Sequence, residues 1–155
     1  MSLHYFDSEF VQMAKEQLPP QQMLRFIKPK YFLRLAAQVK NEKGYSDEKY
    51  ERVKGLIKDD IKFPNLPYLR LHYYYDVTPQ FDEVLVRNTL QVIGHEGRHR
   101  TRHLMEKGFL YTPVILIYNM EPEIPKYVRD QDDTTTLSWS RVFITPEEYS
   151  QLENK

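Results

Sequence analysis

The sequence contains no cysteine, and this absence removes several classes of chemistry at once. Disulfide bonds, thiolate metal sites and cysteine nucleophiles are all excluded, because each of them needs a thiol. The chain also lacks an apolar run approaching the roughly 20 residues that a helix needs to span a bilayer. Its first residues have neither the basic start nor the apolar stretch of a signal peptide. We therefore expect a cytoplasmic protein with no membrane partner.

The chain has no net charge either, since 22 Lys and Arg balance 22 Asp and Glu. A domain that binds duplex DNA nonspecifically is usually net basic, so any contact with nucleic acid is expected to be local. Basic residues are in excess over 24–62 and acidic residues over 119–155. Such a separation is typical of two solvated faces of opposite sign.

What the chain does have is enough apolar material for one core, with 12 Tyr and 8 Phe among 155 residues. This length favours a single domain, residues 1–155. Within it we expect a helical N-terminal part over 1–60 and a core over 66–120. An acidic tail with a final strand and helix is expected over 121–155.

Three helices are predicted in the N-terminal part. Apolar residues recur at helical spacing from Phe6 to Leu18. A second helix is predicted to begin near Pro29, because proline is tolerated in the first helical turn. A third is predicted to begin at Ser46, a good N-cap residue, with Tyr50 facing inward.

Strand patterns dominate the rest of the chain. Alternating or continuous apolar runs predict strands over 68–73, 89–94, 114–118 and 140–144. A helix is predicted over 98–107, ended by Gly108, and a final helix is predicted to begin after the cap Thr145. The order predicts an α+β domain with a small mixed sheet and a β-turn-α-β core, preceded by about three helices.

The segment Gly94-His95-Glu96-Gly97-Arg98-His99-Arg100 joins a predicted strand to a predicted helix. The first turn of a helix has N–H groups without intrahelical partners, and the helix dipole adds partial positive charge there. Glycine lets the backbone approach a ligand closely, and the arginine fork suits phosphate oxygens. The junction therefore predicts an anion site, most often a phosphate site.

Basic side chains are concentrated at this junction, and they are Arg98, His99, Arg100 and Arg102. Positive charges are locally unfavourable at a helix N-terminus, so an anion between them would offset the repulsion. We predict that His95, Gly97, Arg98 and Arg102 contact the ligand. The alternative is that the arginines pair with carboxylates of the acidic C-terminal part.

The same letters allow a zinc interpretation, because residues 95–99 match the H-E-x-x-H pattern. On a helix His95 and His99 would share a face, Glu96 would act as general base, and His103 would be one turn further on. The pattern needs a continuous helix, whereas a strand precedes it and Gly97 interrupts it. We therefore assign no metal ligand, and a zinc hydrolase is kept as an alternative.

From the junction onward the chain reads Glu96-Gly97-Arg98-His99-Arg100, then Leu104, Gly108, Pro113 and Val114-Ile115. This pattern resembles the core of the ParB/sulfiredoxin-like superfamily over about Leu90 to Tyr118. The string from Gly94 to Arg100 is also similar to ParB-like proteins of bacteriophages and mobile elements. For a phage protein, the expected location is the host cytoplasm.

The resemblance implies a nucleotide- or phosphate-binding loop, with a nucleotide and Mg²⁺ as the implied cofactors. Gly97, His99 and Arg100 match the phosphate-contacting positions of the superfamily, and Glu96 matches the acidic position before them. If the protein is an enzyme, a phosphotransferase or a nuclease-like phosphodiesterase is implied, with Glu96, His99 and Arg100 as catalytic residues. Sulfinic-acid reduction is excluded, because the chain has no cysteine.

A non-enzymatic module is the competing hypothesis, in which the same loop binds nucleic acid or a host protein. The other chemically interesting residues have simpler interpretations. Carboxylates at 82–83 and 130–133 are candidates for Mg²⁺ or a base, but loop solvation is more common for such clusters. Tyr73-Tyr74-Tyr75, Trp139 and His72 are assigned to strand packing, core packing and a structural role.

Overall fold

The computed structural model describes residues 12, 16–19, 22–37, 39, 46–56, 66–80, 83–118, 127–129 and 136–153. For residues 73–80, 83–90, 118, 127–129, 136–137, 140 and 153 it describes the backbone alone. The helical elements are α2 (Pro29–Ala36), α3 (Asp47–Val53), the 3-10 turn η1 (Lys54–Leu56), α4 (Arg98–Glu106), α5 (Trp139–Val142) and α6 (Pro146–Glu153). None of the described helices has the length and apolar composition needed to span a bilayer.

The described strands form one mixed sheet in the order β6-β5-β3-β2-β4-β1-β7. Their bounds are β1 Gln22–Ile27, β2 Tyr68–Gln80, β3 Glu83–Glu96, β4 Thr112–Tyr118, β5 Tyr127–Arg129, β6 Thr136–Ser138 and β7 Phe143–Ile144. β2 pairs antiparallel with β3 and parallel with β4, so β3 and β4 run in opposite directions on either side of β2. The α+β class and the mixed sheet are therefore confirmed.

Buried side chains cover both faces of the sheet. In β4, Val114 and Leu116 belong to one apolar cluster and Ile115 belongs to another, as expected when successive strand residues face opposite sides. The first cluster also contains residues of α2 and α5, and the second contains Leu104 of α4 and Tyr149 of α6. The central strand predicted at 114–118 is thus confirmed, since β4 lies between β1 and β2.

Local capping explains where three predicted helices begin or end. The Ser46 side chain accepts a hydrogen bond of 3.0 Å from the Lys49 N–H at the start of α3. At the start of α6, Thr145 and Glu148 each accept a 3.1 Å bond from the other's backbone N–H, a reciprocal capping box. Gly108 follows the end of α4 with φ of 91°.

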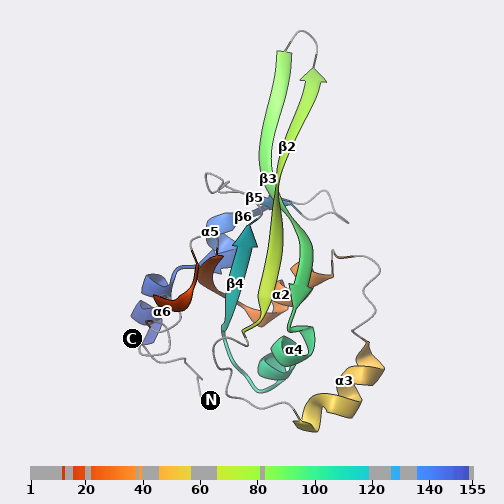
Figure 1. Ribbon diagram of the computed structural model, residues 1–155, viewed down its shortest axis with the longest axis vertical. Helices are drawn as coiled ribbons and strands as arrows, with labels where there is room; N and C mark the ends of the chain where they lie inside the picture. The colour runs from red at the N-terminus through yellow and green to blue at the C-terminus, as the bar shows by residue number, and fades with distance from the viewer. Residues whose placement is uncertain are drawn as a thin grey trace.

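Several features differ from the sequence-based expectation, and the short strands β5 and β6 are two that it did not contain. β1 was not predicted, because its strand character depends on pairing with β4, which is far away in sequence. The hairpin of β2 and β3 is much longer than the two predicted strands, and it projects beyond the rest of the sheet in Figure 1. The strand predicted over 140–144 is mostly wrong, since α5 occupies most of that segment and only Phe143–Ile144 is a strand. Most of the first predicted helix, including Phe6 and Phe10, lies outside the described residues.

Candidate functional site

The junction of β3 and α4 lies at the end of the sheet where β4 begins (Figure 1). Glu96 is the last residue of β3, Gly97 is the N-cap of α4, and Arg98 opens the helix. The first intrahelical bond runs from the Thr101 N–H to the Gly97 carbonyl at 2.8 Å. The N–H groups of the preceding turn are therefore the ones that a helix leaves without intrahelical partners. This first turn contains no acidic residue.

Gly97 is required at this junction for two independent reasons. Its φ is 104°, in the left-handed region that favours glycine. A Cβ atom added there would lie 2.8 Å from Cβ and 3.0 Å from Cα of Pro67. Pro67 is itself held in place, because its carbonyl accepts a 3.0 Å hydrogen bond from the Ile115 N–H. The cap of α4 is thus packed against the backbone that leads into β2.

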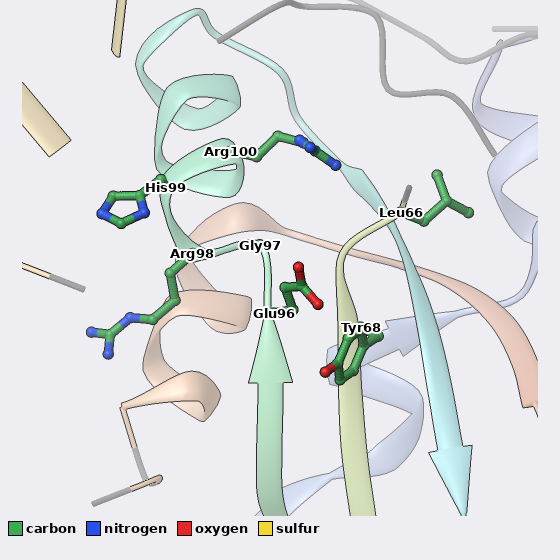
Figure 2. Close-up of a pocket in the computed structure, with 7 residues that line it drawn as sticks. All are labelled: Leu66, Tyr68, Glu96, Gly97, Arg98, His99 and Arg100. Atoms are coloured by element: carbon green, nitrogen blue, oxygen red, sulfur yellow. The ribbon is translucent and has the colours of Figure 1, made fainter. Parts of the chain in front are cut away.

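A cavity of about 360 Å³ opens beside this cap. Its walls are formed by Leu66, Tyr68 and the five consecutive residues Glu96, Gly97, Arg98, His99 and Arg100. In Figure 2 the Arg98 and His99 side chains extend to one side of the start of α4. The Arg100 side chain extends to the other side, where Glu96, Tyr68 and Leu66 also lie. Of the three basic side chains at this helix N-terminus, Arg100 therefore lies on the same side as the Glu96 carboxylate, and Arg98 and His99 lie on the opposite side.

The three residues predicted as catalytic, Glu96, His99 and Arg100, all line this cavity. Of the four predicted ligand contacts, Gly97 and Arg98 line it and His95 and Arg102 do not. His95 lies on β3, where it pairs with Leu69 of β2. Because His95 comes one residue before Glu96 in the strand, the His95 and Glu96 side chains leave opposite faces. The Arg102 side chain lies one helical turn beyond the cavity, against α3.

The zinc interpretation needs an unbroken helix through residues 95–99, and this chain has a different geometry there. His95 and Glu96 belong to β3, His99 belongs to α4, and Gly97 turns the backbone between them with positive φ. Among the described residues there is no group of three His, Asp or Glu side chains placed to hold a metal ion. The H-E-x-x-H helix is therefore not formed.

The helix α3 contacts the side of α4 through Tyr50, a connection that sequence reasoning missed. Tyr50 is fully buried, and its ring is parallel to the His99 ring, with centroids 6.2 Å apart and planes inclined by 6°. The Arg102 guanidinium lies 4.3 Å from the centre of the same ring and forms an ion pair with Asp47 at 2.5 Å. The Tyr50 hydroxyl donates a hydrogen bond to Glu106. The sequence indicated only that Tyr50 faces inward, because these partners are more than 45 positions away.

Burial, and then the bond to Glu106, raise the pKa of Tyr50 well above its ordinary value of 10.0. The folded chain therefore keeps this proton at a pH where the unfolded chain has released it, so stability falls as pH rises above 10.0. In Tyr50→Phe this loss is absent. We expect the difference in unfolding free energy between wild type and Tyr50→Phe to be constant below pH 10.0 and to shrink above it. Urea denaturation of both proteins across this range measures the difference. A constant difference across the whole range would contradict the assignment.

The remaining candidates are placed as follows. Trp139 is buried in the first apolar cluster, which confirms its packing role. His72 is exposed on β2, and residues 73–75 lie in the same strand with only their backbone described. Asp82 and the carboxylates at 130–133 lie outside the described residues.

Comparison with models of known protein families, with curated proteins and with solved structures finds no match to this chain. The resemblance to the ParB/sulfiredoxin-like superfamily therefore stays a prediction. The strand-to-helix-to-strand order that it implies is present over residues 83–118.

Proposed function

We propose that the cavity at the start of α4 binds an anionic, phosphate-bearing ligand, namely a nucleotide or a phosphate ester. The observation that carries the proposal is the coincidence of three features at one place. These are the N-terminal N–H groups of a nine-residue helix, the cavity, and the three consecutive basic residues Arg98, His99 and Arg100 that line it. Backbone N–H groups and the helix dipole favour an anion, and arginine adds paired donors of matching geometry.

The same arrangement supports a chemical role in phosphoryl transfer or phosphodiester cleavage. Arg98 and Arg100 would stabilise the charge that develops on the phosphate, and His99 would donate or shuttle a proton. Glu96 would orient the nucleophile or act as base. With Mg²⁺ bound to a nucleotide, Glu96 is the carboxylate of the cavity wall that would face the metal.

Calorimetric titration of the protein with pyrophosphate and with nucleoside triphosphates, with and without Mg²⁺, tests the proposal. We expect saturable binding that weakens as ionic strength rises, because the attraction is electrostatic.

Glu96→Gln distinguishes the binding of a metal-free anion from the binding of a Mg²⁺-nucleotide. Removing this carboxylate is expected to tighten metal-free pyrophosphate by about fivefold to tenfold, since a like charge leaves the cavity. It is expected to weaken a Mg²⁺-nucleotide if Glu96 faces the metal.

The absence of binding to every one of these anions would contradict the proposal. A second candidate, a non-enzymatic module that binds nucleic acid, would then be favoured by the shape of the β2–β3 hairpin. Within β2 only residues 68–71 pair with β4, and within β3 only Thr89 and Leu90 pair with β5. Beyond these positions the two described strands pair with each other alone, and such a two-stranded ribbon fits the major groove of B-DNA. Titration of a short DNA duplex in the same series distinguishes the two candidates.

A further inference from the structure

Helix α3 is attached to the described part of the molecule in an unusual way, through one buried side chain. From Ser46 to Leu56 the residues are exposed, with two exceptions: Tyr50 is fully buried and Val53 is partly buried. The 3-10 turn η1 that continues α3 ends in Leu56, whose exposure is 82%. The packing of this segment on α4 therefore depends mainly on the contacts of Tyr50 and on the ion pair between Asp47 and Arg102.

The contacts of Tyr50 follow one face of α4. His99, Arg102 and Glu106 occupy positions i, i+3 and i+7 of the helix, which places them above one another on the same side. The Tyr50 ring contacts the first two, and its hydroxyl reaches the third. A single side chain thus spans two turns of α4, starting from the turn that contributes to the cavity.

His99 takes part both in the cavity and in the packing of α3 on α4. The residue lines the cavity, and its ring, which extends to the side of the helix start opposite Arg100 and Glu96 (Figure 2), lies parallel to the Tyr50 ring. A ligand that contacts the first turn of α4 therefore acts on a turn whose position also depends on α3. Ligand binding and the packing of α3 both involve this turn of α4, so they are expected to influence each other, and the influence must be reciprocal.

We propose that α3 is a clamp on the phosphate site, in which Tyr50 is a positioning residue that holds the first turn of α4 in place at the cavity through its contact with His99. Occupancy of the cavity then strengthens the packing of α3 on α4, and loss of that packing weakens ligand binding by the same factor. This inference rests on the proposed function, because it assigns a means of regulation to that site. Any partner that pulls Tyr50 off α4 would weaken ligand binding.

The test uses pyrophosphate as the probe and combines two measurements. Backbone amide hydrogen exchange of residues 47–53 is followed with and without pyrophosphate, with α6 as the internal control, since it packs around Tyr149 rather than Tyr50. Calorimetry then compares wild type, Tyr50→Leu and Tyr50→Phe. The matched control is Leu56→Ala, which truncates an exposed apolar side chain of the same segment.

We expect pyrophosphate to slow exchange in α3 but not in α6. Tyr50→Leu is expected to weaken pyrophosphate binding by about tenfold, within the usual range of coupling between sites. Tyr50→Phe keeps the ring and should stay within about twofold of wild type, because aromatic and cation–π contacts with the ring remain. Leu56→Ala should bind like wild type.

Failure of the clamp and failure of the phosphate site give different results. If wild type binds pyrophosphate but Tyr50→Leu binds equally well and α3 exchange does not change, the clamp is refuted and the phosphate site stands. If wild type does not bind pyrophosphate or any nucleotide, the phosphate site is refuted and the clamp with it. If Tyr50→Leu does not fold, the exchange measurement on wild type decides, since unchanged exchange in α3 refutes the clamp by itself.

Discussion

Gly97→Ala is expected to destabilise the protein by about 3 kcal/mol or more and to abolish the cavity at the start of α4. A residue with a Cβ atom at φ of 104° is strained by about 1–3 kcal/mol before any contact is considered. The new atom would also lie 3.0 Å from the Cα of Pro67, which is backbone rather than the end of a flexible side chain. Either the cap of α4 or the start of β2 must move. Urea denaturation of wild type and variant measures the loss.

Gly108→Ala is the matched control for this prediction. Gly108 lies at the other end of α4 with φ of 91°, so the backbone strain is of the same kind. A Cβ atom there would meet nothing within 4 Å. We therefore expect a loss of about 1–2 kcal/mol, the strain alone. Equal losses in the two variants would show that the approach to Pro67 does not matter.

The sequence predicts those parts of the fold whose causes are local. Ser46 and Thr145 are capping residues whose partners lie three positions away, so the starts of α3 and α6 could be identified without knowledge of the tertiary structure. The strand in β2 could be predicted for a similar reason, because Leu69 and Leu71 are buried while Arg70 and His72 are exposed.

The parts that were missed depend on distant partners. β1 is only six residues long, and its strand form is stabilised by pairing with β4 on one side and β7 on the other. The prolines before and after this strand are equally typical of the end of one helix and the start of the next. The segment 140–144 shows the same limitation, because its apolar pattern alone does not decide between a strand and the short helix α5 that covers residues 140–142.

For the candidate site, the sequence predicts which residues are neighbours but not which way they face. Five consecutive residues from Glu96 to Arg100 line the cavity because a glycine cap places them around one turn. His95 and Arg102 carry suitable chemistry at nearly the same sequence positions, yet they face elsewhere. The alternation of the strand excludes His95, and the position of Arg102 one turn beyond the cavity places it against Tyr50. The role of Tyr50 has no sequence signal, because its contact with His99 joins two helices that are separated by β2 and β3.

Arg100→Ala is expected to weaken pyrophosphate binding by about 10-fold to 150-fold, which corresponds to a hydrogen bond to a charged group worth about 1.5–3 kcal/mol. Arg100 is chosen because its side chain extends to the Glu96 and Tyr68 side of the cavity, whereas Arg98 and His99 extend to the other side (Figure 2). Without it, the anion would face the Glu96 carboxylate with fewer compensating charges. Calorimetric titration at one ionic strength measures the change.

Two further variants show whether the effect comes from the arginine fork or from charge alone. Arg100→Lys keeps the charge but loses the paired planar donors, so its affinity is expected to lie between those of wild type and Arg100→Ala. Arg141→Ala removes one positive charge from an exposed position on α5, outside the cavity wall, and should bind like wild type. Thermal unfolding of each variant shows that the fold is retained. If Arg100→Ala and Arg141→Ala weaken pyrophosphate binding equally, the attraction is a general effect of net charge and the cavity at Gly97 is not the site.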